Sequence, residues 1–268
     1  MGHVLITGGS SGIGLELGRI AIRAGHNVTL VARRPGTLRE AADSLANMAA
    51  DQAAVHTVSA DVSRRAQAES AVHAAIARFG APSHLITCAG AVVPGYFHEL
   101  PVKTFEQLAT VNYLGTLYTL KAAYPSMRAA GSGRIGLVAS AAALIGIFGY
   151  TAYAPTKYAV RGLGECLRAE ARRDGITVTV AYPPDTDTPQ LAEENSTKPL
   201  ETMAITAGSG VWPAADVAQR IWDGMERGRF SVEPGWQMAA LASLHSLIGP
   251  ILRFWFDHIA ERAAKRGN

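Results

Sequence analysis

Short apolar runs alternate with longer amphipathic stretches along most of the chain. The apolar runs are almost continuous rather than alternating, which is typical of strands covered on both faces of a sheet. They predict strands at residues 3–7, 27–32, 54–60, 84–87, 135–139 and 176–182. Apolar residues three and four positions apart predict helices over 13–24, 38–49, 65–79, 105–129 and 154–173.

This repeated alternation predicts βαβ units, and hence a parallel, doubly wound sheet of the Rossmann type with helices on both faces. No linker, repeat or low-complexity tract interrupts it, so we expect a single α/β domain over residues 1–233. A Pro- and Thr-rich stretch at 183–212 falls outside the alternation and is predicted to form a lid. Residues 234–268 are predicted to form a C-terminal apolar and basic helical extension.

The first predicted strand leads into a glycine-rich turn, Thr7-Gly8-Gly9-Ser10-Ser11-Gly12-Ile13-Gly14, and then into a helix. Glycines allow a tight turn and a close approach of the backbone to a pyrophosphate, and the helix N-terminus supplies free N–H donors. A turn between the first strand and first helix is the context that dinucleotide binding requires. The predicted cofactor residues here are Gly8, Ser10, Ser11, Gly12, Ile13 and Gly14.

The end of the second predicted strand indicates which dinucleotide is bound. NAD-dependent enzymes usually place a carboxylate there to bond the ribose 2′-hydroxyl, whereas a basic residue accepts a 2′-phosphate. This strand has no acid at its end and is followed by Arg33 and Arg34. Because a guanidinium can grip a phosphate by a bidentate, charge-assisted pair, the sequence favours NADPH/NADP+. The alternative is that both arginines belong to a solvated edge.

A Tyr-x-x-x-Lys pattern follows the fifth predicted strand, at Tyr153 and Lys157. A separation of four puts both side chains on one helix face, and Pro155 is tolerated only in a first turn, so Tyr153 is predicted at the helix start. Ser140 ends the strand, thirteen residues earlier. With the glycine-rich turn, these motifs resemble the short-chain dehydrogenase/reductase family from residue 3 to about 188.

The resemblance implies a ketone reductase in which Asn112, Ser140, Tyr153 and Lys157 are catalytic. Hydride addition to a ketone leaves an alkoxide that needs a proton. Tyr153 would supply it, with a pKa drawn down by Lys157 from the phenol's usual value of about 10, while Ser140 stabilises the oxyanion. Asn112 would anchor a water-mediated proton relay.

The resemblance also extends the cofactor set, which then includes Asp61, Val62, Ala89, Gly90, Tyr153, Lys157, Pro183, Thr186 and Thr188. It implies a homodimer or tetramer paired through the helices at 105–129 and 154–173, and no metal.

The chain departs from the family's pattern at two positions. Pro184 replaces a glycine, which stiffens its loop, and Thr87 replaces an asparagine. The bond by which that asparagine ties the sheet must come from Thr87 or be absent.

Residues 181–202 and 146–153 resemble the family's reductases of long-chain keto sphingoid bases. This implies NADPH-dependent reduction of 3-ketosphinganine to sphinganine in sphingolipid synthesis. Such a base carries an ammonium beside the ketone, for which the lid offers Asp185, Asp187, Glu193 and Glu194, unless these acids are solvated or cap a lid helix. The alternatives are a reductase of another hydrophobic carbonyl, such as a steroid-like or fatty ketone, and a non-catalytic NADP-binding module. The intact Ser140, Tyr153 and Lys157 argue against the last.

Composition and charge narrow the kinds of partner and the cellular location that we expect. The net charge is +3 and no basic block occurs, so nucleic acid is not expected as a partner. Cys88 and Cys166 both lie in apolar patterns and are predicted to be small buried residues, with no disulfide framework. The chain runs directly into its first strand without room for a signal peptide, so a cytoplasmic location is expected.

The C-terminal extension has no charged residue from Pro234 to Leu252, about the length that spans a bilayer core. Polar residues weaken this interpretation, and Gly249-Pro250 is predicted to break the segment. Three interpretations of the C-terminal extension therefore stay open: a helix packed over the substrate mouth or the dimer interface, an interfacial membrane anchor, or a membrane-spanning helix. Phe254-Trp255-Phe256, with Arg253, Arg262, Lys265 and Arg266, suits an interface. We expect peripheral contact with the cytoplasmic membrane face through residues 236–256.

Overall fold

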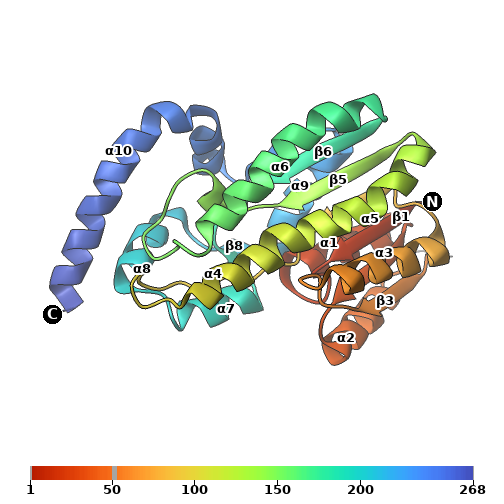
Figure 1. Ribbon diagram of the computed structural model, residues 1–268, viewed down its shortest axis with the longest axis horizontal. Coiled ribbons are helices and arrows are strands. Elements are labelled where there is room, and N and C mark those ends of the chain that lie inside the picture. Colours follow the sequence, from red (N-terminus) through yellow and green to blue (C-terminus); the bar gives the residue numbers. More distant parts are fainter. Residues whose placement is uncertain (1, 50–52, 268) are drawn as a thin grey trace.

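The computed structural model describes residues 2–49 and 53–267, and its centre is the predicted parallel sheet (Figure 1). Seven strands lie in the order β3-β2-β1-β4-β5-β6-β9, with every neighbouring pair parallel. They are β1 His3–Thr7, β2 Asn27–Ala32, β3 Val55–Ser59, β4 His84–Thr87, β5 Gly133–Val138, β6 Ile176–Ala181 and β9 Ser231–Val232. The six strands predicted from sequence agree within two residues at each end. β9 was not predicted, because two residues are too few to show a pattern.

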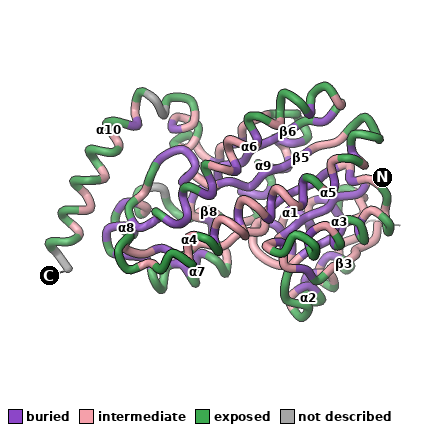
Figure 2. Tube along the Cα trace, viewed as in Figure 1, coloured by how far each residue is buried: buried purple, intermediate pink, exposed green. Residues whose placement is uncertain are grey.

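Helices cover both faces of the sheet, and each face has its own hydrophobic core. One face carries α1 Gly12–Arg23, α2 Pro35–Ala46 and α9 Ala214–Glu226; the other carries α3 Arg65–Phe79, α5 Gly115–Ala130 and α6 Ala154–Arg173. Neighbouring strand residues alternate between the cores: Leu5 packs on the α3, α5 and α6 side, whereas Val4 and Ile6 pack on the other. Figure 2 shows the buried sheet between more exposed helices. This double coverage explains the continuous apolar runs.

The long helix predicted over 105–129 is three consecutive segments in the structure. α4 Val102–Leu108 leads into a π-helical turn, Ala109–Leu114, and then into α5. The wider turn carries Asn112, whose main-chain carbonyl accepts a hydrogen bond from Thr116 Oγ1 at 2.8 Å. Such turns are rare and are frequent at functional sites. A hydrophobic period of three to four residues does not distinguish them from an ordinary α-helix.

The lid predicted at 183–212 is ordered. It contains β7 Thr186–Asp187, α7 Pro189–Asn195, α8 Leu200–Thr206 and β8 Trp212–Pro213, and β7 pairs in parallel with β8. Thr202 Oγ1 donates a hydrogen bond to Phe148 O at 2.9 Å, and Tyr96 donates to Glu201 Oε2 at 3.1 Å. These bonds dock the lid on the loop before α6, through Phe148, and on the loop between β4 and α4, through Tyr96, and so hold it over the edge of the sheet.

The C-terminal extension forms α10 Trp236–Gly267, which packs against α8 (Figure 1). Its two arms, Trp236–Leu244 and Leu247–Lys265, are bent by 116° relative to each other. The break predicted at Gly249-Pro250 was therefore placed too late. Pro250 is the fourth residue of the second arm, close to its start, where a proline disturbs a helix less than it does in the interior. Among the described residues, no single helix is long and apolar enough to cross a membrane; only the two arms of α10 together meet that criterion.

The two cysteines differ in exposure. Cys88 follows β4 and is only partly buried, whereas Cys166 lies exposed on α6. The prediction that Cys166 is buried was wrong. It follows the buried Gly164 by two positions, which puts it on the opposite side of a helix with 3.6 residues per turn.

Two glycines of α6 provide a test of how tightly this helix packs on the sheet. A Cβ at Gly164 would lie 2.5 Å from Val180 Cγ2, whereas a Cβ at Gly162 would have no atom within 4 Å. We expect Gly164→Ala to destabilise the protein by about 1–3 kcal/mol through overpacking. Gly162→Ala, the matched control, should stabilise it by up to about 1 kcal/mol through helix propensity. Urea unfolding measures both, and equal changes would contradict the close packing.

Candidate active site

A single large cavity of about 1220 Å³ lies at the carboxyl edge of the sheet. The strand order reverses there, because β1 is flanked by β2 on one side and β4 on the other. Ligands of open parallel sheets bind at such a switch point. The volume exceeds the roughly 300–1,000 Å³ typical of a pocket for one small molecule, so two ligands fit side by side.

The glycine-rich turn forms one end of the cavity. Gly8, Ser10, Ser11, Gly12 and Ile13 line it. Gly14 lies beneath the turn rather than on the cavity wall, and a Cβ there would lie 2.3 Å from Gly8 O. No side chain caps the N-terminus of α1. Free N–H groups and a turn that only glycine permits fit the pyrophosphate of a dinucleotide.

The residues predicted to hold the adenosine end lie along the same cavity. Arg33 and Arg34 are exposed at its edge, and neither makes an ion pair within the described part of the chain. Asp61 and Val62 line the wall. Asp61 Oδ1 accepts hydrogen bonds from Ser63 N at 3.0 Å and from Ser63 Oγ at 2.7 Å, so this carboxylate also shapes the turn before α3. Two unpaired guanidiniums fit a phosphate group.

Asn112 lies behind the cavity wall and joins two of its parts. Its Oδ1 accepts from Ala91 N at 2.8 Å, and its Nδ2 donates to Ala91 O and to Thr156 Oγ1, both at 2.9 Å. The loop after β4, whose Ala89 and Gly90 line the cavity, is thereby fixed to the start of α6. The hydroxyl of Thr87 is buried without a partner among the described residues, so it does not replace the asparagine of the family.

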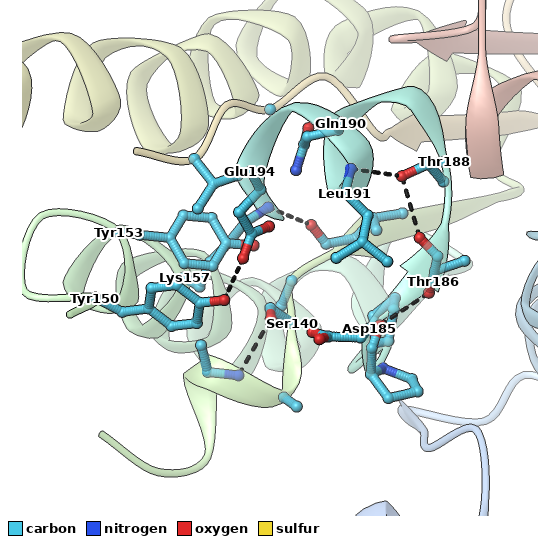
Figure 3. A pocket seen from close by; sticks show the side chains of 18 of the residues that line it. Ser140, Tyr150, Tyr153, Lys157, Asp185, Thr186, Thr188, Gln190, Leu191 and Glu194 are labelled. Atoms are coloured by element: carbon cyan, nitrogen blue, oxygen red, sulfur yellow. Dashed lines mark hydrogen bonds between the residues drawn. The ribbon is translucent and has the colours of Figure 1, made fainter. Parts of the chain in front are cut away.

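Ser140, Tyr153 and Lys157 meet on one wall of the cavity (Figure 3). Tyr153 is the N-cap of α6, as the position of Pro155 predicted. Lys157 Nζ donates to Val138 O at 3.0 Å and lies 5.8 Å from the centre of the Tyr153 ring. Ser140 Oγ accepts from Ala142 N at 3.1 Å, which orients its hydroxyl at the end of β5.

Burial shifts the pKa values of this pair in opposite directions. It lowers the pKa of Lys157 to about 8 and raises that of Tyr153. A hydrogen bond from Ser140 acts against the rise at Tyr153, while the carboxylates of Glu194 and Asp185 add to it. We expected the pKa of Tyr153 to be drawn down, but burial outweighs the effects that lower it, and the net shift is upward. A phenol that stays protonated at neutral pH is a proton donor, not a base.

The loop after β6 completes the cofactor side. Pro183, Thr186 and Thr188 line the cavity. Ala141 N donates to Pro183 O at 2.9 Å, which ties this loop to the end of β5. Thr188 Oγ1 caps α7 by accepting from Leu191 N at 3.2 Å, and Thr186 Oγ1 donates to Pro184 O at 2.8 Å. The loop is thus held by its own bonds, in line with the stiffness expected from Pro184.

Sequence reasoning missed Tyr150 and Lys198. The Tyr150 ring packs edge-on against Tyr153, with centroids 5.5 Å apart, and its hydroxyl donates to Glu194 Oε1 (Figure 3). Lys198 is buried against Glu194 and Asp185. The spacing of four between Glu194 and Lys198 was a signal for that pair. Nothing local indicated Asp185, which is thirteen residues away.

The far end of the cavity is apolar, and the sequence did not indicate which residues line it. Residues of the loop before α6 and of α10 line it, namely Ile145, Ile147, Leu241, Ile248, Leu252 and Phe256. α10 therefore covers the mouth of the cavity, which is one of the three alternatives left open by its sequence.

Comparisons with known proteins agree with this geometry. The family model described as short chain dehydrogenase matches residues 2–199. A 3-dehydrosphinganine reductase of Danio rerio is 41% identical over 93% of this chain and 76% of the relative. A 3-ketodihydrosphingosine reductase of Mus musculus is 40% identical over the same shares, and one of Dictyostelium discoideum is 33% identical over 95% and 81%.

Two solved structures share the fold. Levodione reductase superposes with a TM-score of 0.80 at 26% identity, covering 89% of this chain and 98% of that one. An alcohol dehydrogenase from the archaeon Thermococcus sibiricus, complexed with 5-hydroxy-NADP, superposes with a TM-score of 0.75 at 24% identity, covering 87% and 96%.

Proposed function

Because the chain belongs to the short-chain dehydrogenase family, and so is an oxidoreductase with a nicotinamide cofactor, we propose that it reduces 3-ketosphinganine to sphinganine. The observation that carries this proposal is the lining of the cavity. Tyr153 shares the cavity with the glycine-rich turn and with apolar side chains of α10. A dinucleotide fits the turn and a long alkyl chain fits the apolar side chains.

The chain's own residues perform the proton chemistry. A nicotinamide cofactor held by the glycine-rich turn would supply the hydride for the carbonyl carbon. Ser140 and Tyr153 donate hydrogen bonds to the carbonyl oxygen, and the contact strengthens as that oxygen gains negative charge. Tyr153 then gives its proton to the oxygen, since burial keeps it protonated until that moment. The ammonium of Lys157, 5.8 Å from the ring, stabilises the phenolate that remains.

A steroid-like or fatty ketone is the competing substrate class, because an apolar cavity end does not by itself select an alkyl chain attached to an amine. A non-catalytic module is disfavoured, since Ser140, Tyr153 and Lys157 are all present and share one wall.

We expect the purified protein with NADPH to reduce 3-ketosphinganine, and to do so faster than it reduces steroid ketones. Oxidation of NADPH followed by absorbance measures this rate. Tyr153→Phe should keep NADPH binding and lose at least about a hundredfold in turnover, the lower range for acid–base catalysis. If the protein prefers a steroid ketone, the proposed substrate is wrong. If Tyr153→Phe turns over as fast as the wild type, Tyr153 is not the proton donor.

We further propose that NADPH is preferred over NADH, on the basis of the two unpaired arginines at the cavity edge. Arg33→Asp should reverse the preference, because its carboxylate repels the 2′-phosphate. Arg39→Asp, the same charge change at an exposed position of α2 outside the cavity, is the control and should preserve it. The ratio of kcat/KM for the two cofactors is the measurement. Equal use of both by the wild type would contradict the proposal.

Membrane contact through α10 is a second part of the proposed function. The second arm is apolar on two sides: Leu252 and Phe256 face the cavity, whereas Leu247, Ile251 and Phe254 are 73%, 69% and 75% exposed. A helix whose inner side lines the cavity and whose outer side is apolar suits a bilayer surface. A substrate embedded in lipid then reaches Tyr153 without crossing water. The location at the cytoplasmic membrane face, and pairing of copies through α5 and α6, stay predictions.

We expect the full chain to co-sediment with anionic vesicles, and Phe254→Glu to weaken this binding at least tenfold. Ala264→Glu places the same charge on an exposed position of α10 beyond residues 236–256, and should bind nearly as the wild type does. A wild-type protein that stays in the supernatant at low salt would show that α10 only covers the cavity.

A further inference from the structure

Three charged side chains are packed together beside Tyr153. Lys198 Nζ lies 3.0 Å from Glu194 Oε1 and 3.2 Å from Asp185 Oδ2. The side chain of Lys198 is 1% exposed and that of Glu194 is 9% exposed. Two carboxylates against one ammonium leave this trio with a formal charge of −1. Because a buried net charge is unfavourable without a counter-ion, the trio is suited to receive a cation.

The trio presents its acceptors to the cavity. Asp185 and Glu194 line the cavity, whereas Lys198 does not, so the lysine holds both carboxylates from behind. Glu194 Oε2 and Asp185 Oδ1 have no hydrogen-bond or ion-pair partner among the described residues. Figure 3 shows that Glu194 and Asp185 border the same space as Ser140 and Tyr153. A nine-tenths buried carboxylate thus keeps one free oxygen on the active-site wall.

Tyr150 connects the trio to the catalytic residues. Its hydroxyl donates to Glu194 Oε1, and its ring contacts that of Tyr153. The field of the two carboxylates reaches the catalytic phenol, because both raise the pKa of Tyr153. A cation held by Glu194 and Asp185 therefore lies close to the carbonyl group that Tyr153 protonates.

An α-amino ketone carries such a cation in the right place, since its ammonium is bonded to the carbon next to the carbonyl. Resting on the proposed function, we propose that Glu194 and Asp185 bind the substrate's ammonium group while Ser140 and Tyr153 hold its carbonyl oxygen. Lys198 is then a positioning residue that fixes the two carboxylates. The other lid acids considered from sequence, Asp187 and Glu193, are exposed and make no ion pair within the described part of the chain, and of the two only Glu193 lines the cavity.

The test compares 3-ketosphinganine with a chain-matched ketone in which hydrogen replaces the amino group. The wild type should prefer the amine by at least about tenfold in kcat/KM at slightly acid pH. Glu194→Gln should lose most of this preference by slowing only the amine, because the glutamine keeps the shape and removes the charge. Asp187→Asn is the matched control, because it removes one negative charge from an exposed lid position that does not line the cavity, and it should keep the preference.

The outcomes separate the two proposals. If the wild type reduces both ketones equally, or if Glu194→Gln keeps the preference, the ammonium site is wrong and the proposed reaction stands. If the wild type does not reduce 3-ketosphinganine, the proposed reaction fails and the ammonium site with it. An equal loss in Asp187→Asn would indicate a long-range charge effect and overturn the site. If Glu194→Gln does not fold, Asp185→Asn removes a charge from the same trio. The ratio of kcat/KM for the two ketones then tests the site in the same way.

Discussion

The carboxyl edge of the parallel sheet is the constraint on which the rest of the structure depends. Parallel strands all end at the same edge, so the glycine-rich turn after β1, the arginines after β2 and Ser140 after β5 are brought together although they are far apart in sequence. Main-chain groups at these strand ends then hold the site: Val138 O accepts from Lys157, and Pro183 O accepts from Ala141 N. The site is therefore positioned by backbone as much as by side chains.

Burial at this edge determines the protonation chemistry. The same removal of water lowers the pKa of Lys157 and raises that of Tyr153, because each loses solvation of its charged form. The Glu194 and Asp185 carboxylates reinforce the second shift. In the reaction we propose, the phenol must still hold its proton when the alkoxide forms, and the acidic lid would favour Tyr153 as the proton donor.

Features that depend on local spacing were predictable from the sequence. The strands and the placement of Tyr153 at a helix start belong to this class, since each follows from a few consecutive residues. The π-helical turn around Asn112, the pairing of Asp185 with Lys198 and the bend of α10 depend on tertiary packing. β9 is a two-residue strand formed only because β6 offers it an edge. The direction of the Tyr153 pKa was missed for the same reason: burial and the lid carboxylates are not visible in a Tyr-x-x-x-Lys motif.

The alternation of side chains between two cores has a consequence for how the sequence can change. Val4 and Ile6 share packing partners on one face of the sheet, whereas Leu5, between them, belongs to the other core. Effects of substitutions are coupled when side chains share a cavity and nearly additive when they do not. Epistasis along a strand should therefore connect every second residue, and the two faces of the sheet can drift almost independently in evolution. A substitution in one core should therefore have little effect on which substitutions the other core tolerates.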